Sequence, residues 1–211
     1  MTQADLVDVI RIAGIEDPRL IAAFETIPRA GFVPRHLVGL AYEDEPLPIP
    51  HDQVTTQPSL SAVMIEALEL KPSERVLEVG SGYGFQTALL AQLCAHVTSI
   101  EIWADLAEVA RSNLGAHSIE NVEVVAGDGS LGVPDRAPFD AVLVSAAFTR
   151  VPKPLVDQLV DGGRLVQPIG RGGDEIVTLF RKTEGRLVEV RDVIPARFVR
   201  LVGEEAFPGG L

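Results

Sequence analysis

The chain has little positive charge and almost no cysteine. Its 18 Lys and Arg residues stand against 30 Asp and Glu, which gives a formal net charge of −12. Because nucleic-acid backbones are bound through a basic face, this balance argues against a nucleic-acid partner. The single cysteine, Cys94, cannot form an internal disulfide and lies in an apolar helical pattern. We expect it to be a small buried core residue.

The chain also lacks long hydrophobic runs. No apolar stretch approaches the ~20 residues that a membrane-spanning helix needs. The first residues lack the basic and apolar regions of a secretory signal. We therefore expect a cytoplasmic protein with no membrane partner. At 211 residues and 46% hydrophobic content, the chain is long enough to bury one sizeable core.

Residues 76–84, Val-Leu-Glu-Val-Gly-Ser-Gly-Tyr-Gly, predict a buried strand followed by a tight turn. A helical pattern begins at once at Phe85. In a parallel sheet, such a turn lets a ligand lie against bare backbone at the carboxyl end of the strand. The next strand-like run, 96–101, ends in Glu101, which is placed to accept both hydroxyls of a ribose. Together these features predict a nucleoside site.

The spacing of the turn indicates which nucleoside. Its glycines follow the pattern E-x-G-x-G-x-G from Glu78, whereas a dinucleotide fingerprint is spaced G-x-G-x-x-G to bind a pyrophosphate. We expect Glu78 to point its negative charge toward the crevice, where it would repel a pyrophosphate and attract a cation. S-adenosylmethionine carries an amino group and a sulfonium but no phosphate, so it is favoured over NAD. A tight turn that binds no ligand is the alternative.

Strand and helix patterns alternate along the chain after residue 58, which indicates a parallel sheet covered by helices on both faces. The predicted fold is α/β: a Rossmann-like, doubly wound, mostly parallel sheet with an N-terminal helical extension and an antiparallel C-terminal edge. We expect a single domain, 1–211, with an acceptor-side extension at 1–57 and a cofactor-binding core at 58–203. The predicted helices are 2–14, 17–27, one from Pro58, 85–94, 103–115 and 152–160. The predicted parallel strands are 75–79, 96–101, 121–126, 139–145 and 163–168. Two consecutive antiparallel strands are predicted at 176–180 and 187–200, joined by a turn at 184–185.

Two polar segments lie near the predicted site. Asp128, between two glycines, follows a strand and could accept a hydrogen bond from the exocyclic amine of adenine; a plain Asp-Gly turn is the alternative. Residues 55–57, Thr-Thr-Gln, precede the helix that begins at Pro58. They either cap that helix or face a methyl acceptor. His51 and Asp52 have no third ligand at a suitable spacing, so no metal site is expected.

The sequence resembles the protein-L-isoaspartate O-methyltransferase family of class I S-adenosylmethionine-dependent enzymes. The resemblance covers about residues 18–203, and the proline-rich run that leads into residues 53–58 is its more specific part. The matching runs are 29–34 (Arg-Ala-Gly-Phe-Val-Pro), 41–44 (Ala-Tyr-Glu-Asp), 46–49 (Pro-Leu-Pro-Ile), 53–58, 75–84, 127–129, 137–140, 145–147 and 162–170.

This resemblance implies methyl transfer from S-adenosylmethionine to the α-carboxylate of L-isoaspartyl residues. The ester then collapses to a succinimide that hydrolyses partly to normal aspartate, so the family repairs damaged proteins. By position, the implied cofactor-binding residues are Glu78, Gly80, Ser81, Gly82, Glu101, Ile102, Asp128 and Gly129. The implied acceptor-side residues are Thr56, in the place of the active-site serine, and Thr55, Gln57, Val199 and Arg200.

The chain departs from the family pattern at two places. Its run Val54-Thr55-Thr56 stands where Thr-Ile-Ser is usual, and Arg200 replaces the proline of a late Phe-Val-Pro-Leu. Thr56 keeps a hydroxyl, which would orient the acceptor carboxylate by hydrogen bonding, and Arg200 restores an amide donor and adds a charge. A carboxylate acceptor is already ionised, so no strong general base is required.

Three other activities stay open at this point. They are a carboxyl methyltransferase with a dedicated peptide or aspartate substrate, a non-catalytic S-adenosylmethionine-binding module and, more remotely, an NAD enzyme. The altered run at residues 54–56 motivates the first of them. For the repair enzyme, the expected partners are isoaspartyl-containing proteins or peptides, and the expected state is a monomer.

Overall fold

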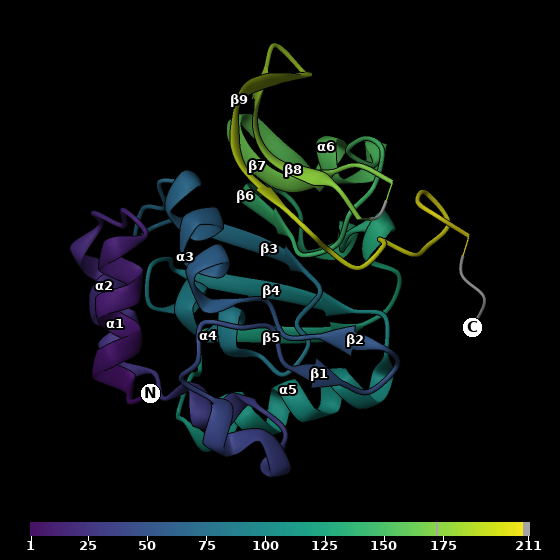
Figure 1. Cartoon of the computed structure of the whole chain (residues 1–211). Helices are drawn as coiled ribbons and strands as arrows, with labels where there is room; N and C mark the ends of the chain where they lie inside the picture. The colour runs from purple at the N-terminus through teal and green to yellow at the C-terminus, as the bar shows by residue number, and fades with distance from the viewer. Residues whose placement is uncertain (172, 209–211) are drawn as a thin grey trace.

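A seven-stranded β-sheet forms the centre of the computed structural model, which describes residues 1–171 and 173–208 (Figure 1). The strand order is β5-β4-β3-β6-β7-β8-β9, and neighbours are parallel from β5 to β7. β8 and β9 add antiparallel strands at one edge. The predicted α/β fold with an antiparallel C-terminal edge is confirmed. The strands are β3 (Arg75–Val79), β4 (His96–Glu101), β5 (Val122–Ala126), β6 (Phe139–Val144), β7 (Leu159–Ile169), β8 (Glu175–Thr183) and β9 (Arg186–Ala196).

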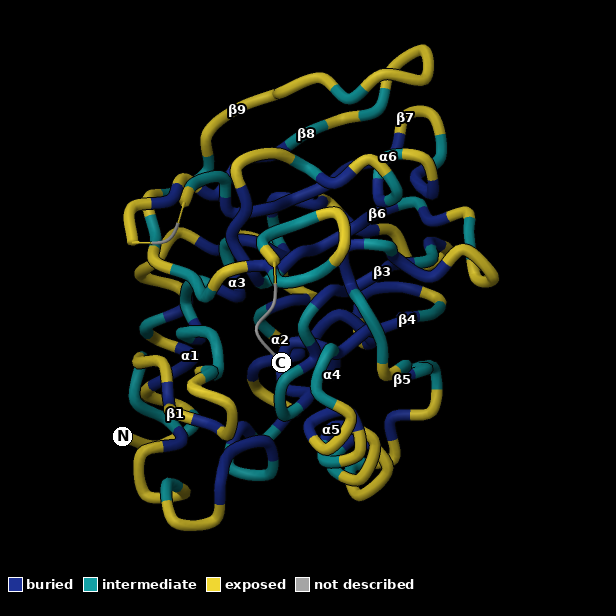
Figure 2. The backbone as a smooth tube through the Cα atoms, turned by 90° about the vertical axis from the view of Figure 1, so that its right-hand side faces the viewer, coloured by how far each residue is buried: buried dark blue, intermediate teal, exposed yellow. Residues whose placement is uncertain are grey.

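Helices cover both faces of the sheet, and the central strands between them are buried (Figure 2). Alternate residues of a strand point to opposite faces. Val76 and Leu143 therefore join one apolar cluster with residues of α1 to α5, whereas Leu77 and Val142 join a second cluster that includes Leu155 of α6. The helices are α1 (Gln3–Ile12), α2 (Pro18–Thr26), α3 (Pro58–Ala67), α4 (Phe85–Ala91), α5 (Ala104–Ala116) and α6 (Lys153–Gln158).

The start of β7 differs from the prediction. The strand begins at Leu159, not at 163, because Leu159 pairs with Phe139 before a register shift that precedes the Ala141–Arg164 pair. Gly162 lies in this irregular stretch with φ +82°, a conformation that glycine adopts without steric cost. The bulge lets the strand continue through Gly162 and Gly163.

The proline-rich segment before α3 contains little regular structure. It forms two short 3₁₀ helices, η1 (Arg29–Phe32) and η2 (Arg35–Leu40), and a small antiparallel hairpin of β1 (Pro48–Ile49) and β2 (Gln53–Val54). The hairpin was not predicted, because two-residue strands leave no periodic pattern in a sequence.

Two expectations from composition can be compared with the structure. Cys94 is buried, as predicted, and burial raises the pKa of its thiol to about 12. Within the described residues, no helix combines the length and the apolar character that crossing a bilayer requires.

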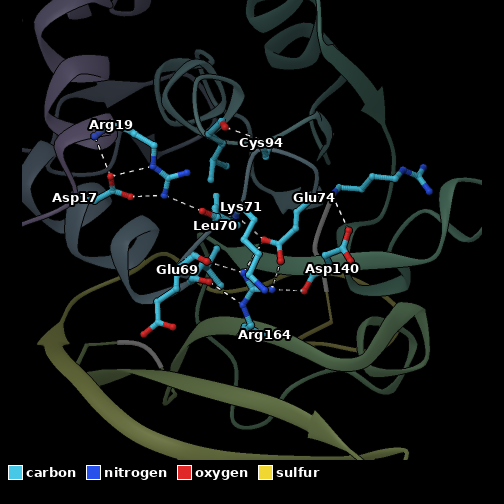
Figure 3. Close-up of polar contacts among 12 residues, drawn as sticks. Asp17, Arg19, Glu69, Leu70, Lys71, Glu74, Cys94, Asp140 and Arg164 are labelled. Atoms are coloured by element: carbon cyan, nitrogen blue, oxygen red, sulfur yellow. Dashed lines mark hydrogen bonds and ion pairs between the residues drawn. The ribbon is translucent and has the colours of Figure 1, made fainter.

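A buried ion pair joins three elements at the amino ends of the central strands (Figure 3). Arg164 of β7 donates to both oxygens of Glu74, at 2.8 and 2.7 Å, and to the backbone oxygens of Leu68 and Glu69, at 2.8 and 3.0 Å. Burial raises the pKa of Glu74, but the hydrogen bond and charge of Arg164 and the backbone N–H of Lys71 outweigh it, so the pKa lies below its usual value. The pair fixes the turn from α3 into β3.

We expect Arg164→Met to lower the free energy of unfolding by about 3–5 kcal/mol, because Glu74 would stay buried without its cation. Urea denaturation monitored by circular dichroism would measure the loss. The exposed pair of Arg136 and Glu123 provides the control, since Arg136→Met should barely move the unfolding midpoint. Equal effects of the two substitutions would contradict a special role for the buried pair.

Candidate functional site

A cavity opens at the carboxyl ends of the central strands. β4 and β6 flank β3 on opposite sides, so the chain reverses its direction of progress across the sheet at β3. Ligands of open α/β sheets bind at such a switch point. Val79, Ile100 and Ser145, at the ends of these strands or just after them, line the cavity.

The glycine-rich turn after β3 forms one wall of the cavity. Gly80, Gly82 and Gly84 have φ values of +96°, +52° and +91°, which side chains of other residues rarely allow. Gly80 and Gly82 line the cavity together with Ser81. The turn therefore exposes backbone to a ligand, as the sequence predicted.

Glu101 lies beside this turn at the end of β4. Its Oε2 accepts from the N–H of Gly82 at 2.9 Å, and its Oε1 accepts from the N–H of Trp103 at 3.2 Å. Burial raises the pKa of Glu101, although these backbone N–H groups and that of Ile102 act in the opposite direction. The result is a fixed, largely buried carboxyl group that lines the cavity together with Ile102 and can accept further hydrogen bonds.

Glu78 does not point into the crevice, so the predicted orientation is wrong. Its side chain is 0% exposed and is absent from the cavity wall. Its oxygens accept from Thr87 Oγ1 at 2.5 Å, Ser99 Oγ at 2.6 Å and Gln86 Nε2 at 3.1 Å. Burial raises the pKa of Glu78, and the three hydrogen bonds oppose the rise. Glu78 thus supports the turn from the side of α4, because it alternates with Leu77 and Val79 along the strand.

The Asp128 carboxylate is also directed elsewhere. Asp128 does not line the cavity, so the predicted contact of its carboxylate with a ligand is not supported. Oδ1 accepts from the N–H and the hydroxyl of Ser130, at 2.8 and 2.7 Å, and Oδ2 accepts from the N–H of Glu204 at 2.7 Å. Only its neighbour Gly129 lines the cavity. The Asp128 carboxylate therefore anchors the segment after Gly203, a long-range partner that the local motif could not reveal.

Four of the five predicted acceptor-side residues line a second cavity that adjoins the first. Gln57 lines only the second cavity, and Arg200 lines only the first. The two cavities share the residues Val54, Thr55, Thr56, Ser145 and Val199. This shared wall is the place where groups held in the two cavities come together.

Residues 55–57 do not cap α3, so that alternative is wrong. Gln57 is the residue before the helix, but its side chain accepts no hydrogen bond there. Asp44 performs the capping instead: its Oδ1 accepts from the N–H of Ser59 at 2.8 Å, and its Oδ2 accepts from Gln57 Nε2 at 2.9 Å. Because Asp44 caps the helix, Thr56 is not needed as a cap, and it lines both cavities instead.

Arg29 fastens the segment that carries these threonines. Its guanidinium is 1% exposed and donates to the backbone oxygens of Ala41, Glu43 and Glu45 and to Thr55 Oγ1, at 2.9 to 3.1 Å. Burial lowers the pKa of Arg29 to about 10, although the charge of Asp44 acts in the opposite direction. The Thr55 hydroxyl therefore has a structural hydrogen bond to Arg29, and this bond holds the neighbouring Thr56 at the wall of the two cavities.

The C-terminal side of the site is held by a short parallel bridge. The N–H of Ala147 donates to the oxygen of Val199, and the N–H of Leu201 donates to the oxygen of Ala147, both at 2.8 Å. Arg200, between them, is exposed, with its guanidinium 5.2 Å from the ring centroid of Phe207. The segment brings Val199 and Arg200 to the cavity wall.

Sequence reasoning missed several residues of the site. Gln86 and Ser145 both line the cavity, Gln86 two residues after the glycine turn and Ser145 directly after β6. His51 pairs with Asp105 instead of Asp52, with Nε2 at 2.9 and 3.0 Å from its oxygens, and stacks on Trp103 with 3.9 Å between ring centroids. Residues 1–171 and 173–208 contain no cluster of three His, Cys, Asp or Glu side chains arranged to hold a metal ion.

The sequence is similar to a family with a known activity. Residues 1–206 match the sequence model described as Protein-L-isoaspartate(D-aspartate) O-methyltransferase. A relative from Methanoculleus marisnigri, named protein-L-isoaspartate O-methyltransferase, is 48% identical over 201 residues, which cover 95% of this chain and 90% of that protein.

Solved structures are similar over nearly the whole chain. One named protein-L-isoaspartate O-methyltransferase has a TM-score of 0.85 and 31% identity, and the match covers 97% of this chain and 67% of that one. Another, from Plasmodium falciparum and in complex with S-adenosyl-L-homocysteine, has a TM-score of 0.79 and 23% identity, covering 96% and 99% of the two chains. The second likeness shows the shared fold.

The contacts of Arg29 predict that its guanidinium stabilises the acceptor side of the site. Arg29→Met should lower the free energy of unfolding by at least about 2 kcal/mol, because several buried oxygens lose their donor. Chemical denaturation would measure this. Arg35→Met, at an exposed arginine six residues later, is the matched control and should leave stability close to that of the parent protein. A parent-like Arg29→Met protein would contradict the prediction.

Proposed function

This chain belongs to the protein-L-isoaspartate O-methyltransferase family, and we propose that it methylates the α-carboxylate of L-isoaspartyl residues in damaged proteins or peptides. The methyl donor is S-adenosylmethionine. The ester formed collapses to a succinimide, which starts repair of the damaged residue. The family match over residues 1–206 is the observation that carries this proposal, and the two adjoining cavities at the switch point support it.

The first cavity has the features that the nucleoside part of this cofactor needs. Backbone at Gly80 and Gly82 allows close approach, and a Cβ on Gly129 would collide with Val79. The Glu101 carboxylate is placed to accept ribose hydroxyls. When bound, S-adenosylmethionine supplies a methyl group on a positively charged sulfur. We assign the cofactor-facing role to the wall residues Gly80, Ser81, Gly82, Glu101, Ile102 and Gly129, and a supporting role to Glu78 and Asp128.

Thr56 lies on the wall that both cavities share, where its hydroxyl can hydrogen-bond the acceptor carboxylate. That carboxylate is already ionised, so the residues need not remove a proton. Their task is to align the attacking oxygen with the methyl carbon and the sulfur. Such positioning contributes up to ~7–11 kcal/mol in favourable cases.

The remaining acceptor-side residues act around Thr56. Thr55 holds the segment through Arg29, and Gln57 and Val199 form walls of the second cavity. Arg200 presents an exposed positive charge to the peptide. We propose that the chain acts as a single-domain monomer in the cytoplasm, on isoaspartyl-containing proteins and without nucleic-acid or membrane partners.

Transfer of labelled methyl to two matched peptides tests the proposed activity. The peptides differ only in one L-isoaspartyl or L-aspartyl residue. We expect base-labile label on the isoaspartyl peptide alone, because only its α-carboxylate matches the acceptor of the family. Label on neither peptide, with cofactor binding confirmed by calorimetry, would refute repair of generic peptides and favour a dedicated substrate.

Variants of Thr56 test how the acceptor is oriented. Thr56→Ser keeps the hydroxyl and should retain most of the activity. Thr56→Val has nearly the same shape but no hydroxyl, and should lower kcat/KM roughly tenfold to a hundredfold, as expected for one hydrogen bond to a charged group. Steady-state kinetics with the isoaspartyl peptide would decide; a fully active valine variant would exclude Thr56 from the reaction.

The pH dependence of cofactor binding tests Glu101. Burial raises the pKa of this carboxyl above its usual value. Ribose hydroxyls would donate to the ionised form, so binding releases a proton, and affinity should fall as the pH decreases through the raised pKa. Calorimetry with S-adenosylhomocysteine across the mildly acidic range would measure this. Glu101→Gln should bind roughly tenfold more weakly near neutral pH and lack the pH dependence; an unchanged profile would contradict the assignment.

A further inference from the structure

Ser145 occupies a central position that the proposed function leaves unused. It directly follows β6, at the carboxyl end of a strand beside the switch point, and it lines both cavities. Among the residues common to both walls, the polar side chains are Thr55, Thr56 and Ser145. Thr55 Oγ1 already accepts from Arg29 and from the N–H of Leu47. Two donors fix the Thr55 oxygen toward Arg29 and Leu47, so Ser145 and Thr56 are the hydroxyls of the shared wall that are freer to turn toward a ligand at the junction.

The orientation of the Ser145 hydroxyl is set by Gln86. Gln86 Nε2 lies 2.7 Å from Ser145 Oγ and 3.1 Å from Glu78 Oε1, so one amide nitrogen donates to both. The other Glu78 oxygen is held by Thr87 and Ser99. Rotating the amide of Gln86 would bring its oxygen against the Glu78 carboxyl group. The buried carboxyl group therefore keeps the amide nitrogen directed at Ser145.

A hydroxyl that accepts a hydrogen bond on one side must direct its own hydrogen elsewhere. In the described part of the chain, Ser145 donates to no protein acceptor. The glycine turn passes close to Ser145, since a Cβ built on Gly80 would lie 3.5 Å from Ser145 Cβ. Gly80 itself has no side chain that would come between Ser145 and the first cavity.

The two ends of the Gln86 amide differ in how they are satisfied. Its side chain is only 7% exposed and lines the first cavity, yet its Oε1 is buried with no hydrogen-bond partner among residues 1–171 and 173–208. Buried polar atoms are nearly always hydrogen-bonded. Because Oε1 is itself an acceptor, a carboxylate could not complete it, so only the Gln86 nitrogen bears on the Ser145 hydroxyl.

We propose that Ser145 donates its hydroxyl hydrogen to the acceptor carboxylate and, with Thr56, forms a two-hydroxyl cradle for it. This inference rests on the proposed function and names a further substrate-binding residue, with Gln86 as the positioning residue behind it. Two donors in fixed places stop the carboxylate from rotating about its bond to the α-carbon. One oxygen is then held while the other faces the methyl group.

The chemical step balances without a proton transfer. A lone pair of the free carboxylate oxygen forms the new bond to the methyl carbon, and the bond from that carbon to sulfur breaks. Its electron pair goes to sulfur, which becomes a neutral thioether. Ser145 and Thr56 keep their hydrogens throughout. Their contribution is therefore to orientation, and it requires a hydroxyl but no acidic or basic group.

Substitutions at Ser145 test the cradle. Ser145→Ala should lower kcat/KM for the isoaspartyl peptide roughly tenfold to a hundredfold, because a hydrogen bond to a charged group is lost. Ser145→Thr retains the hydroxyl and should recover most of the activity. In both variants the affinity for S-adenosylhomocysteine, measured by calorimetry, should match that of the parent protein. Ser112→Ala, on an exposed position of α5, is the matched control.

The outcomes separate this inference from the function on which it rests. A parent protein that labels no isoaspartyl peptide refutes the proposed function. An active parent protein with an equally active Ser145→Ala variant refutes the cradle alone. A loss of activity accompanied by an equal loss of S-adenosylhomocysteine affinity also refutes it, since Ser145 would then serve the cofactor cavity. Retained cofactor affinity, lost activity and recovery with threonine support it.

Discussion

A carboxyl group buried in the middle of a parallel sheet without a cation must collect hydrogen bonds, and this requirement organises the site. Glu78 of β3 draws in Ser99 of β4 and both Thr87 and Gln86 of α4. Gln86 extends the network to Ser145 after β6. Through these contacts the Glu78 carboxyl group connects β4 and the end of β6, which flank β3, to helix α4 after the glycine turn. The turn is held in shape by these contacts, and the cavity forms above it.

The acceptor side is stabilised in a different way, because it consists of chain without regular secondary structure. Arg29 satisfies backbone oxygens of the segment from Ala41 to Glu45, and Asp44 of that segment in turn caps α3 at Ser59. Backbone without regular structure has to find such partners when it is buried. The result is a fixed loop that presents Thr56 beside the cofactor cavity. The site therefore combines the strand ends of an open α/β sheet on one side with a loop held by side chains on the other.

This division also explains how the two cavities can share one wall. The cofactor side uses strand ends and bare glycine backbone, whereas the acceptor side uses the segments around Thr56 and Val199. Val199 is fixed to Ala147, only two residues beyond Ser145. The C-terminal segment is therefore attached to the residues that follow β6, and β6 belongs to the same sheet as the strand that precedes the glycine turn. Movement of either side would change the distance between the groups that react.

The sequence by itself determined the parallel strands from β3 to β6, the glycine turn and the position of Glu101, because these depend on side-chain periodicity and on the backbone freedom of glycine, both of which are local. Through a family resemblance it also predicted that Thr56 faces the methyl acceptor. Only the tertiary structure decided that Glu78 faces α4, that Asp128 holds the segment at Glu204 and that Asp44 caps α3. Each of these polar groups found its partner across a large sequence separation or on a neighbouring element. A hydrogen-bonding side chain has several possible partners within a motif, and the packed fold selects among them by deciding which are buried beside it.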